Sequence, residues 1–102
     1  MQSGKEDIND LVYDIFEDKR VIKYREKHEE DTDLQNRIDD KYILLSINPY
    51  KESENSFKSS KCPKCKKTRI GDHRMIYFIH ESRKEIEIID FDLRKKIYKK
   101  WD

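Results

Sequence analysis

The sequence predicts an α+β domain in which two helices pack on one face of a mostly antiparallel β-sheet. Two observations lead to this prediction. The apolar residues gather in stretches of helical or strand period, at 11–16, 34–47, 75–79, 86–91 and 97–101. These stretches follow the order strand, helix, helix, three strands and a short C-terminal helix. Although 44% of the residues are charged and 34% hydrophobic, this patterning indicates a folded domain rather than a disordered chain.

A strand and a helix are predicted first. The apolar and aromatic run Leu11–Phe16 has the composition of a β-strand. Asp18 can cap a helix that reaches about His28, because its carboxylate can accept a hydrogen bond from the first turn. Val21, Tyr24 and His28 then fall on one face of this helix.

A second helix is predicted next, capped by Asp31 or Asp33. Its apolar residues form a core stripe at helical spacing, made of Leu34, Ile38, Tyr42 and Leu45 and widened by Ile43, Leu44 and Ile47. The helix is expected to end at Asn48-Pro49, since the residue before proline disfavours the helical conformation. The polar segment Tyr50–Ser60 is then a long and mobile connector.

The C-terminal half predicts three strands. A basic strand is expected near Cys62–Arg69, and Gly71-Asp72 marks the turn that follows it. The next strand spans His73–His80 and alternates between two faces. One face carries His73, Met75, Tyr77 and Ile79, and the other carries Arg74, Ile76, Phe78 and His80.

A turn at Glu81–Lys84 leads into the last strand, where Glu85 and Glu87 alternate with isoleucines. A final helix is predicted from Asp92 or Leu93 to Trp101. Leu93, Ile97 and Trp101 recur along it at i, i+4 and i+8, so they are expected to share one face.

Charge is distributed unevenly along the chain although the net charge is only +1. Residues 1–57 carry 9 Lys and Arg against 15 Asp and Glu, whereas residues 58–102 carry 14 against 7. The basic half predicts a site for a polyanion such as RNA, and the simpler alternative is a solvated surface of alternating Lys and Glu.

One domain is expected over residues 11–102, after a flexible tail at 1–10. No apolar run is long enough for a membrane span, and the polar N-terminus lacks the hydrophobic region of a signal peptide. The expectation is therefore a cytoplasmic protein without a membrane partner. Its oligomeric state stays open, with a homodimer as one possibility.

The middle hairpin reads Arg69-Ile70-Gly71-Asp72-His73-Arg74-Met75-Ile76-Tyr77. Near the end of the chain, Arg94 is followed four residues later by Tyr98. With these motifs and with Asn48-Pro49 after the helical hairpin, residues 11–101 resemble the RelE/ParE toxin superfamily. Its hairpin often reads Arg-x-Gly-Asp-Tyr-Arg-x-x-Tyr, and its last arginine is followed four residues on by a tyrosine.

The resemblance implies a toxin of a toxin–antitoxin system. Its relatives of the RelE type cleave mRNA in the ribosomal A site without a metal, by attack of a ribose 2′-hydroxyl on the adjacent phosphate. The implied partners are a cognate antitoxin, mRNA and the ribosome, and no cofactor is implied.

Carried over by position, Lys67 would hold the phosphate, and Arg74 and Arg94 would stabilise the charge that develops in the transition state. Tyr98 would be the acid–base or stacking residue. The RNA-binding residues expected around the basic strand are Lys61, Lys64, Lys66, Lys67 and Arg69. From the residues alone, Tyr98 could equally pack under the sheet with Trp101. A buried or stacking role is expected for His73, which stands where the family has tyrosine.

Some residues depart from the family pattern. Cys65 stands where a further lysine is usual, and Asp92-Leu93 replaces the usual Gly-His before the last arginine. An acid beside the phosphate site would oppose the binding of a polyanion. Two alternatives therefore stay open, namely a non-catalytic protein- or peptide-binding module on the same fold, and a ParE-like inhibitor of DNA gyrase.

Cys62-Pro63-Lys64-Cys65 is half of a structural zinc site, but the chain has no other cysteine to complete it. A local disulfide or two reduced thiols is the main expectation. The alternative is a zinc ion held by Cys62 and Cys65, for instance between the two chains of a homodimer, which would make the protein a zinc-knuckle binder of nucleic acid.

Overall fold

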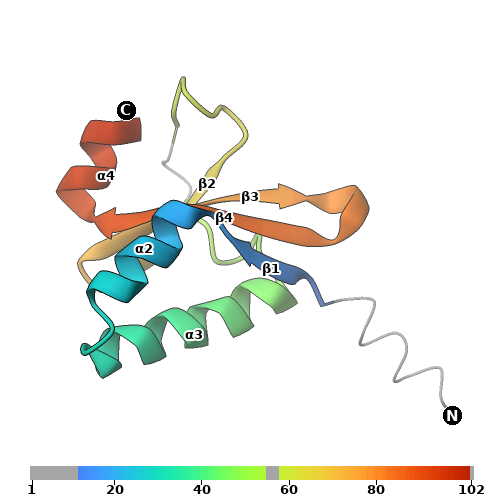
Figure 1. Cartoon of the computed structure of the whole chain (residues 1–102). Helices are drawn as coiled ribbons and strands as arrows, with labels where there is room; N and C mark the ends of the chain where they lie inside the picture. Colours follow the sequence, from blue (N-terminus) through green and yellow to red (C-terminus); the bar gives the residue numbers. More distant parts are fainter. Residues whose placement is uncertain (1–11, 55–57, 102) are drawn as a thin grey trace, which may run out of the picture.

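A mixed β-sheet forms the centre of this computed structural model, which describes residues 12–54 and 58–101 (Figure 1). In this part of the chain the strand order is β1 (Asp14–Glu17), β4 (Glu85–Leu93), β3 (His73–His80) and β2 (Lys66–Ile70). β1 runs parallel to β4, and the other pairs are antiparallel. The predicted α+β class with a mostly antiparallel sheet is confirmed.

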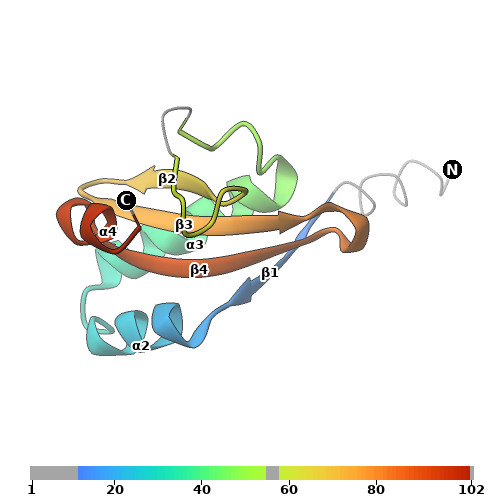
Figure 2. The ribbon, with the colours of Figure 1, turned by 90° about the horizontal axis from the view of Figure 1, so that it is seen from above.

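Helices cover both faces of the sheet. α2 (Lys19–Lys27) and α3 (Thr32–Ile47) pack on one face, and α4 (Arg94–Trp101) packs on the other. Figure 1 shows α3 beneath the sheet and α4 above one end of it. The view from above shows that α4 lies at the end of the β3–β4 hairpin that is opposite its tip (Figure 2). The short 3-10 helix η1 (Glu81–Arg83) forms that tip. None of the described helices is both long and apolar enough to cross a membrane.

The helix starts follow from the capping residues. Asp18 accepts a hydrogen bond from the Arg20 backbone N–H at 2.9 Å, and Asp31 accepts one from that of Leu34 at 3.1 Å. Of the two predicted caps for α3, Asp31 is therefore the one used. Each cap satisfies a backbone donor that the first turn leaves free, which typically stabilises a helix by about 1 kcal/mol.

The predicted alternation of β3 separates two apolar clusters. Met75 and Tyr77 are fully buried against α2 and α3, whereas Ile76 is fully buried against α4. Ile97 and Trp101 complete the smaller cluster under α4. Both faces of β3 are thus apolar at its centre, so α4 is held on the sheet by packing as well as by the chain connection.

Three predictions about the core and the strand ends are wrong. Ile43, Leu44 and Ile47 do not widen the buried stripe of α3 but are 59%, 47% and 60% exposed, because the sheet covers only one side of the helix. Leu93 is likewise exposed rather than packed with Ile97 and Trp101. β1 begins only at Asp14 and β2 only at Lys66. Leu11, the predicted start of the first strand, lies outside the described residues.

The predicted connector is partly fixed against the sheet. The Tyr77 hydroxyl donates to the Pro49 carbonyl at 2.5 Å, and the Thr68 hydroxyl donates to the Glu52 carbonyl at 2.7 Å. The Glu54 N–H donates to the Lys67 carbonyl, also at 2.7 Å. Residues 49–54 therefore run along the outer edge of β2 and bring the Glu54 side chain next to Lys67. Residues 55–57 of the connector lie outside the described part.

The β2–β3 turn depends on Gly71, whose φ of +58° lies in the left-handed region that favours glycine. This tight turn pairs Arg69 of β2 with Arg74 of β3 across the hairpin. Arg94 donates its backbone N–H to the Asp72 carbonyl at 3.0 Å, so the start of α4 is tied to the same turn.

Candidate functional site

Side chains from three separate elements meet beside the β2–β3 turn. Lys67 comes from β2, Arg74 from β3, and Arg94 and Tyr98 lie one turn apart on α4. These are the four residues for which the sequence predicted a role in catalysis or in holding the phosphate. The sheet register and the tie between Arg94 and Asp72 place them on the same side of the sheet.

The Tyr98 hydroxyl is the point on which two cations converge. It accepts hydrogen bonds from Lys67 Nζ at 3.1 Å and from Arg94 Nε at 3.2 Å. Lys67 Nζ also lies 4.3 Å from the centroid of the Tyr98 ring, and Arg94 Cζ lies 5.2 Å from it. Tyr98 also packs, partly buried, against the apolar cluster that contains Ile97 and Trp101, so its ring has a packing contact while its hydroxyl has polar ones.

These cations lower the pKa of the Tyr98 hydroxyl, first through the hydrogen bond from Arg94 and then through that from Lys67. The chain's other tyrosines behave in the opposite way. Burial or a neighbouring carboxylate raises the pKa of Tyr13, Tyr24, Tyr42, Tyr50 and Tyr77. Tyr98 is thus distinguished electrostatically from every other phenol of the protein.

A spectrophotometric titration should therefore find one tyrosine that ionises below the usual pKa of about 10, ahead of the others. Tyr98→Phe should remove this first step, and Arg94→Ala should shift it to higher pH because the phenolate loses a hydrogen-bond donor. Arg83→Ala, at the far tip of the hairpin, serves as the control and should leave the step unchanged. A first ionisation that survives Tyr98→Phe would contradict the assignment.

Arg74 is buried, with 7% of its surface exposed, and the turn fixes its guanidinium. Its Nη1 donates to the carbonyl oxygens of His73 at 2.8 Å and Gly71 at 3.2 Å. It is therefore not a solvent-exposed strand arginine. A buried guanidinium held in this way presents its charge in one orientation.

Glu54 is a member of the site that the sequence did not reveal. Its Oε1 lies 3.3 Å from Arg74 Nε and 3.5 Å from Lys67 Nζ. Both Glu54 Oε1 and Arg74 Nε are buried without a well-formed hydrogen bond. Since the carboxylate lies within 3.5 Å of both cations, it occupies a position that suits an anionic oxygen of a ligand.

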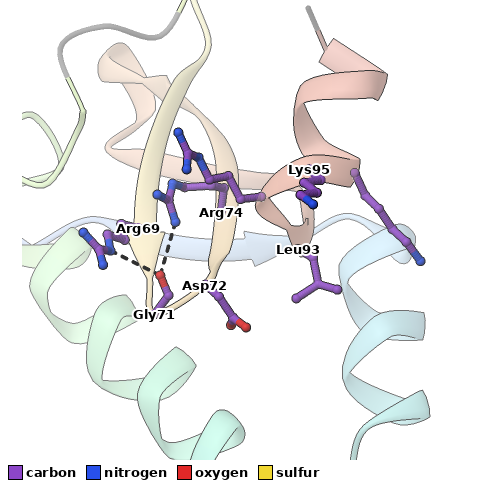
Figure 3. A pocket seen from close by; sticks show the side chains of 8 residues that line it. Arg69, Gly71, Asp72, Arg74, Leu93 and Lys95 are labelled. Carbon is purple, nitrogen blue, oxygen red and sulfur yellow. Dashed lines mark hydrogen bonds between the residues drawn. The ribbon is translucent and has the colours of Figure 1, made fainter.

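A pocket of about 550 Å³ opens between the turn and the start of α4 (Figure 3). The Gly71 carbonyl accepts hydrogen bonds from both Arg69 and Arg74 and so holds these arginines at one wall. Arg94, Lys95 and Lys96 line it from α4. Asp72 is the one carboxylate among the described lining residues, so the pocket is strongly cationic and suits a phosphate chain.

α4 is anchored to the sheet at its far end by a buried acid. Asp90 accepts hydrogen bonds from the Trp101 indole N–H at 2.9 Å and from the backbone N–H of Phe91. Lys100 Nζ lies 3.1 Å from the same carboxylate. The Ser59 hydroxyl also donates to the Trp101 carbonyl. Because both ends of α4 are fixed, Tyr98 has a defined position over Lys67.

Comparisons with known proteins identify the fold. No family model and no curated protein sequence matches the chain. A chain of the toxin–antitoxin complex RelBE2 of Mycobacterium tuberculosis superposes with a TM-score of 0.66, covering 82% of this chain and 93% of that one at 16% identity. A double arginine-to-alanine variant of the Escherichia coli toxin RelE in the free state gives a TM-score of 0.64, covering 87% and 93%, also at 16% identity. The chain has a RelE-like fold. At this low identity the likeness establishes the fold alone.

Within the RelE-like fold, the remaining predicted RNA-binding residues divide into two groups. Arg69 lines the cationic pocket. Lys61, Lys64 and Lys66 do not join the site: Lys61 Nζ donates to the Lys100 carbonyl, Lys64 is exposed in the loop, and Lys66 Nζ lies over the Tyr50 ring. Lys66 lies away from the site because it neighbours Lys67 in β2, and neighbouring residues of a strand point to opposite faces.

The two cysteines form a disulfide, Cys62–Cys65, in the loop that leads into β2. The predicted basic strand therefore starts four residues later than Cys62, and the thiols are not available as zinc ligands in this state. No other cluster of three potential metal ligands is found among residues 12–54 and 58–101. Cys65 is buried against Ile97 and Trp101, so the loop supports α4.

His73 and Asp92 both depart from the family pattern, and each contacts residues outside the cationic pocket. His73 stacks on Phe91 with ring centroids 4.8 Å apart and shares a 2.8 Å hydrogen bond with the Tyr24 hydroxyl. The expected buried or stacking position is therefore observed. Asp92 pairs with Lys100 at 3.3 Å. It does not line the cationic pocket, and its charge is paired with Lys100 instead.

Proposed function

We propose that this protein is the toxin of a toxin–antitoxin pair and cleaves mRNA on the ribosome by attack of a ribose 2′-hydroxyl. The observation that carries the proposal is the Tyr98 hydroxyl, held by Lys67 and Arg94 beside a pocket lined by Arg74. A phenol with a lowered pKa surrounded by fixed cations suits proton transfer at a phosphate. The RelE-like fold agrees with this reading.

In the proposed reaction the 2′-oxygen bonds to the adjacent phosphorus and its proton passes to solvent water. The bond between phosphorus and the 5′-oxygen breaks, and Tyr98 donates its proton to that leaving oxygen. Lys67, Arg74 and Arg94 stabilise the additional negative charge on the phosphate oxygens. Lys67 and Arg94 also stabilise the phenolate that Tyr98 becomes, and solvent returns its proton. The products are a 2′,3′-cyclic phosphate and a free 5′-hydroxyl.

Glu54 is proposed to hold Lys67 and Arg74 in place until a phosphate of the RNA takes over its contacts. Glu54→Gln is then expected to tighten the binding of an uncleavable, 2′-O-methylated RNA by roughly 3- to 10-fold, because a negative charge beside the phosphate is removed. Fluorescence anisotropy measures this affinity. Glu52→Gln removes a charge that pairs with Lys41 instead, so it serves as the control. Equal affinities for both variants and the wild type would contradict the role of Glu54.

A cognate antitoxin is the proposed protein partner. The support for it is the structural neighbour from Mycobacterium tuberculosis, which was solved as a toxin–antitoxin complex. An inhibitor of this protein would have to cover the cationic pocket or displace α4, because these two features carry the proposed chemistry.

Induced expression of the wild type tests the proposal, with growth followed and cellular mRNA mapped by primer extension. Growth arrest with cuts in phase with the codons is the expected result. Arrest without RNA cuts would overturn the nuclease and favour a target such as gyrase. Soluble, folded protein with neither arrest nor cuts would favour a binding module.

A further inference from the structure

The acidic N-terminal half of the chain contains a basic helix face that the average charge conceals. Arg20, Lys23 and Lys27 lie on α2 at i, i+3 and i+7, which places them on one side of the helix. All three side chains are exposed. This helix side is distinct from the buried one, where Val21 is packed in the core.

This face borders a second hollow, of about 300 Å³, between α2 and the end of α4. The hollow exists because β1 pairs only with residues Glu85–Ile88 of β4. Beyond Ile88 the edge of β4 is flanked by α2 on one side and by α4 on the other. Arg20 Cζ lies 5.6 Å from the centroid of the Trp101 ring, which shows how closely the two helices approach.

The carboxylates around the hollow are engaged with partners of their own. Asp90 is buried and bonded to Trp101, and Lys100 Nζ lies within 3.3 Å of both Asp90 and Asp92. Asp18 pairs with Arg20 at 3.2 Å, but it also caps α2. The exposed ammonium groups of Lys23 and Lys27 therefore dominate the outer rim of the hollow.

The hollow and the cationic pocket are lined by neighbouring residues of β4 and α4. Asp92 lines the first and the adjacent Leu93 lines the second, and α4 contributes Lys100 to the hollow and Lys95 and Lys96 to the pocket. Cations thus follow one path from the β2–β3 turn along α4 to α2. Such a path matches the regular negative charge of a phosphate backbone.

We propose that Arg20, Lys23 and Lys27 of α2 bind the RNA backbone beyond the cleavage site, so that the protein contacts RNA along this whole path. The proposal rests on the proposed nuclease function, because it assumes that RNA occupies the pocket. The α2 face adds affinity for long RNA and takes no part in the chemical step.

Fluorescence anisotropy with 2′-O-methylated RNA tests the proposal, using one RNA of about five nucleotides and one of about twenty. The variant is Arg20→Gln/Lys23→Gln/Lys27→Gln. The control, Lys51→Gln/Arg83→Gln/Lys84→Gln, removes the same charge from exposed residues at the other end of the sheet. Circular dichroism checks that both variants are folded.

For the long RNA, losing three phosphate contacts should lower the salt slope by about 2, because each contact to a single strand contributes about 0.7. The ratio of the wild-type affinity to the α2-variant affinity for the long RNA should then fall by roughly 20-fold between about 50 mM and about 200 mM salt. The short RNA should bind the wild type, the variant and the control equally.

An α2 variant that matches the control in affinity and salt slope for the long RNA would overturn the proposal. The proposal would also be overturned if the α2 variant bound long RNA like the wild type but no longer bound anionic lipid vesicles. That result would assign the face to a membrane surface. Failure of the premise that RNA occupies the pocket is distinguishable, because the wild type would then not bind the short RNA, and failure of cleavage itself would appear as the absence of RNA cuts.

Discussion

Growth arrest is expected to disappear when Arg74 and Arg94 are both replaced by alanine. Each guanidinium is proposed to stabilise negative charge on the phosphate, and loss of one such donor typically slows a reaction by about 10²- to 10³-fold. Losing two should reduce RNA cleavage by more than about 10³-fold, below the level that stops growth. Induced expression with growth curves measures the effect.

Two further variants make this result interpretable. Arg74→Lys/Arg94→Lys keeps both positive charges and should retain part of the activity. If the role of Arg74 were purely structural, this lysine variant should instead misfold, because lysine cannot reproduce the hydrogen bonds of the guanidinium. Arg83→Ala/Lys84→Ala removes two exposed cations at the hairpin tip and should arrest growth like the wild type. If the folded alanine variant of Arg74 and Arg94 stays toxic, the proposed site is wrong.

Tyr98→Phe is expected to slow RNA cleavage by about 10²- to 10⁴-fold, the usual contribution of general acid–base catalysis. Phenylalanine keeps the ring that Lys67 contacts but lacks the hydroxyl that gives its proton to the 5′-oxygen. Single-turnover cleavage of mRNA on programmed ribosomes measures the rate. The wild-type rate should also fall as the pH rises past the lowered pKa of Tyr98, since only the protonated phenol is an acid.

Tyr50→Phe is the matched control for this experiment. Tyr50 is exposed, and its hydroxyl donates to Glu81 at the other end of the sheet. Its removal should leave the cleavage rate unchanged. If Tyr98→Phe cleaves RNA as fast as Tyr50→Phe, the proton must come from another group and Tyr98 has at most a stacking role.

The features predicted correctly from the sequence are local ones. The Asp18 and Asp31 caps depend on residues within the same turn, and the alternation of β3 depends only on strand geometry. Ile43, Leu44 and Ile47 of α3 were wrongly predicted to widen the core stripe, because local spacing does not reveal how wide a side of the helix the sheet covers. Ile43 and Ile47 are exposed for that reason.

The residues that meet at the candidate site were named in part from the sequence, while their role stays a prediction. The resemblance of the hairpin and of the Arg94 and Tyr98 spacing to a known family pointed to residues that the fold does bring together. Glu54 was missed because its position depends on how residues 49–54 cross the edge of β2, which no local pattern encodes. The basic face of α2 does not appear in the net charge of residues 1–57, because many acidic residues outweigh it there, although the helical spacing of Arg20, Lys23 and Lys27 is visible in the sequence.

The end groups of the RNA test the central claim most directly, namely that a 2′-hydroxyl attacks a phosphate held by Lys67, Arg74 and Arg94 with Tyr98 as the acid. Programmed ribosomes are incubated with the wild type or with Arg74→Ala/Arg94→Ala, and the termini of the fragments are identified. The expected result is a 2′,3′-cyclic phosphate and a 5′-hydroxyl with the wild type, and intact mRNA with the variant. Fragments that carry a 5′-phosphate, or equal cleavage by both proteins, would contradict the mechanism.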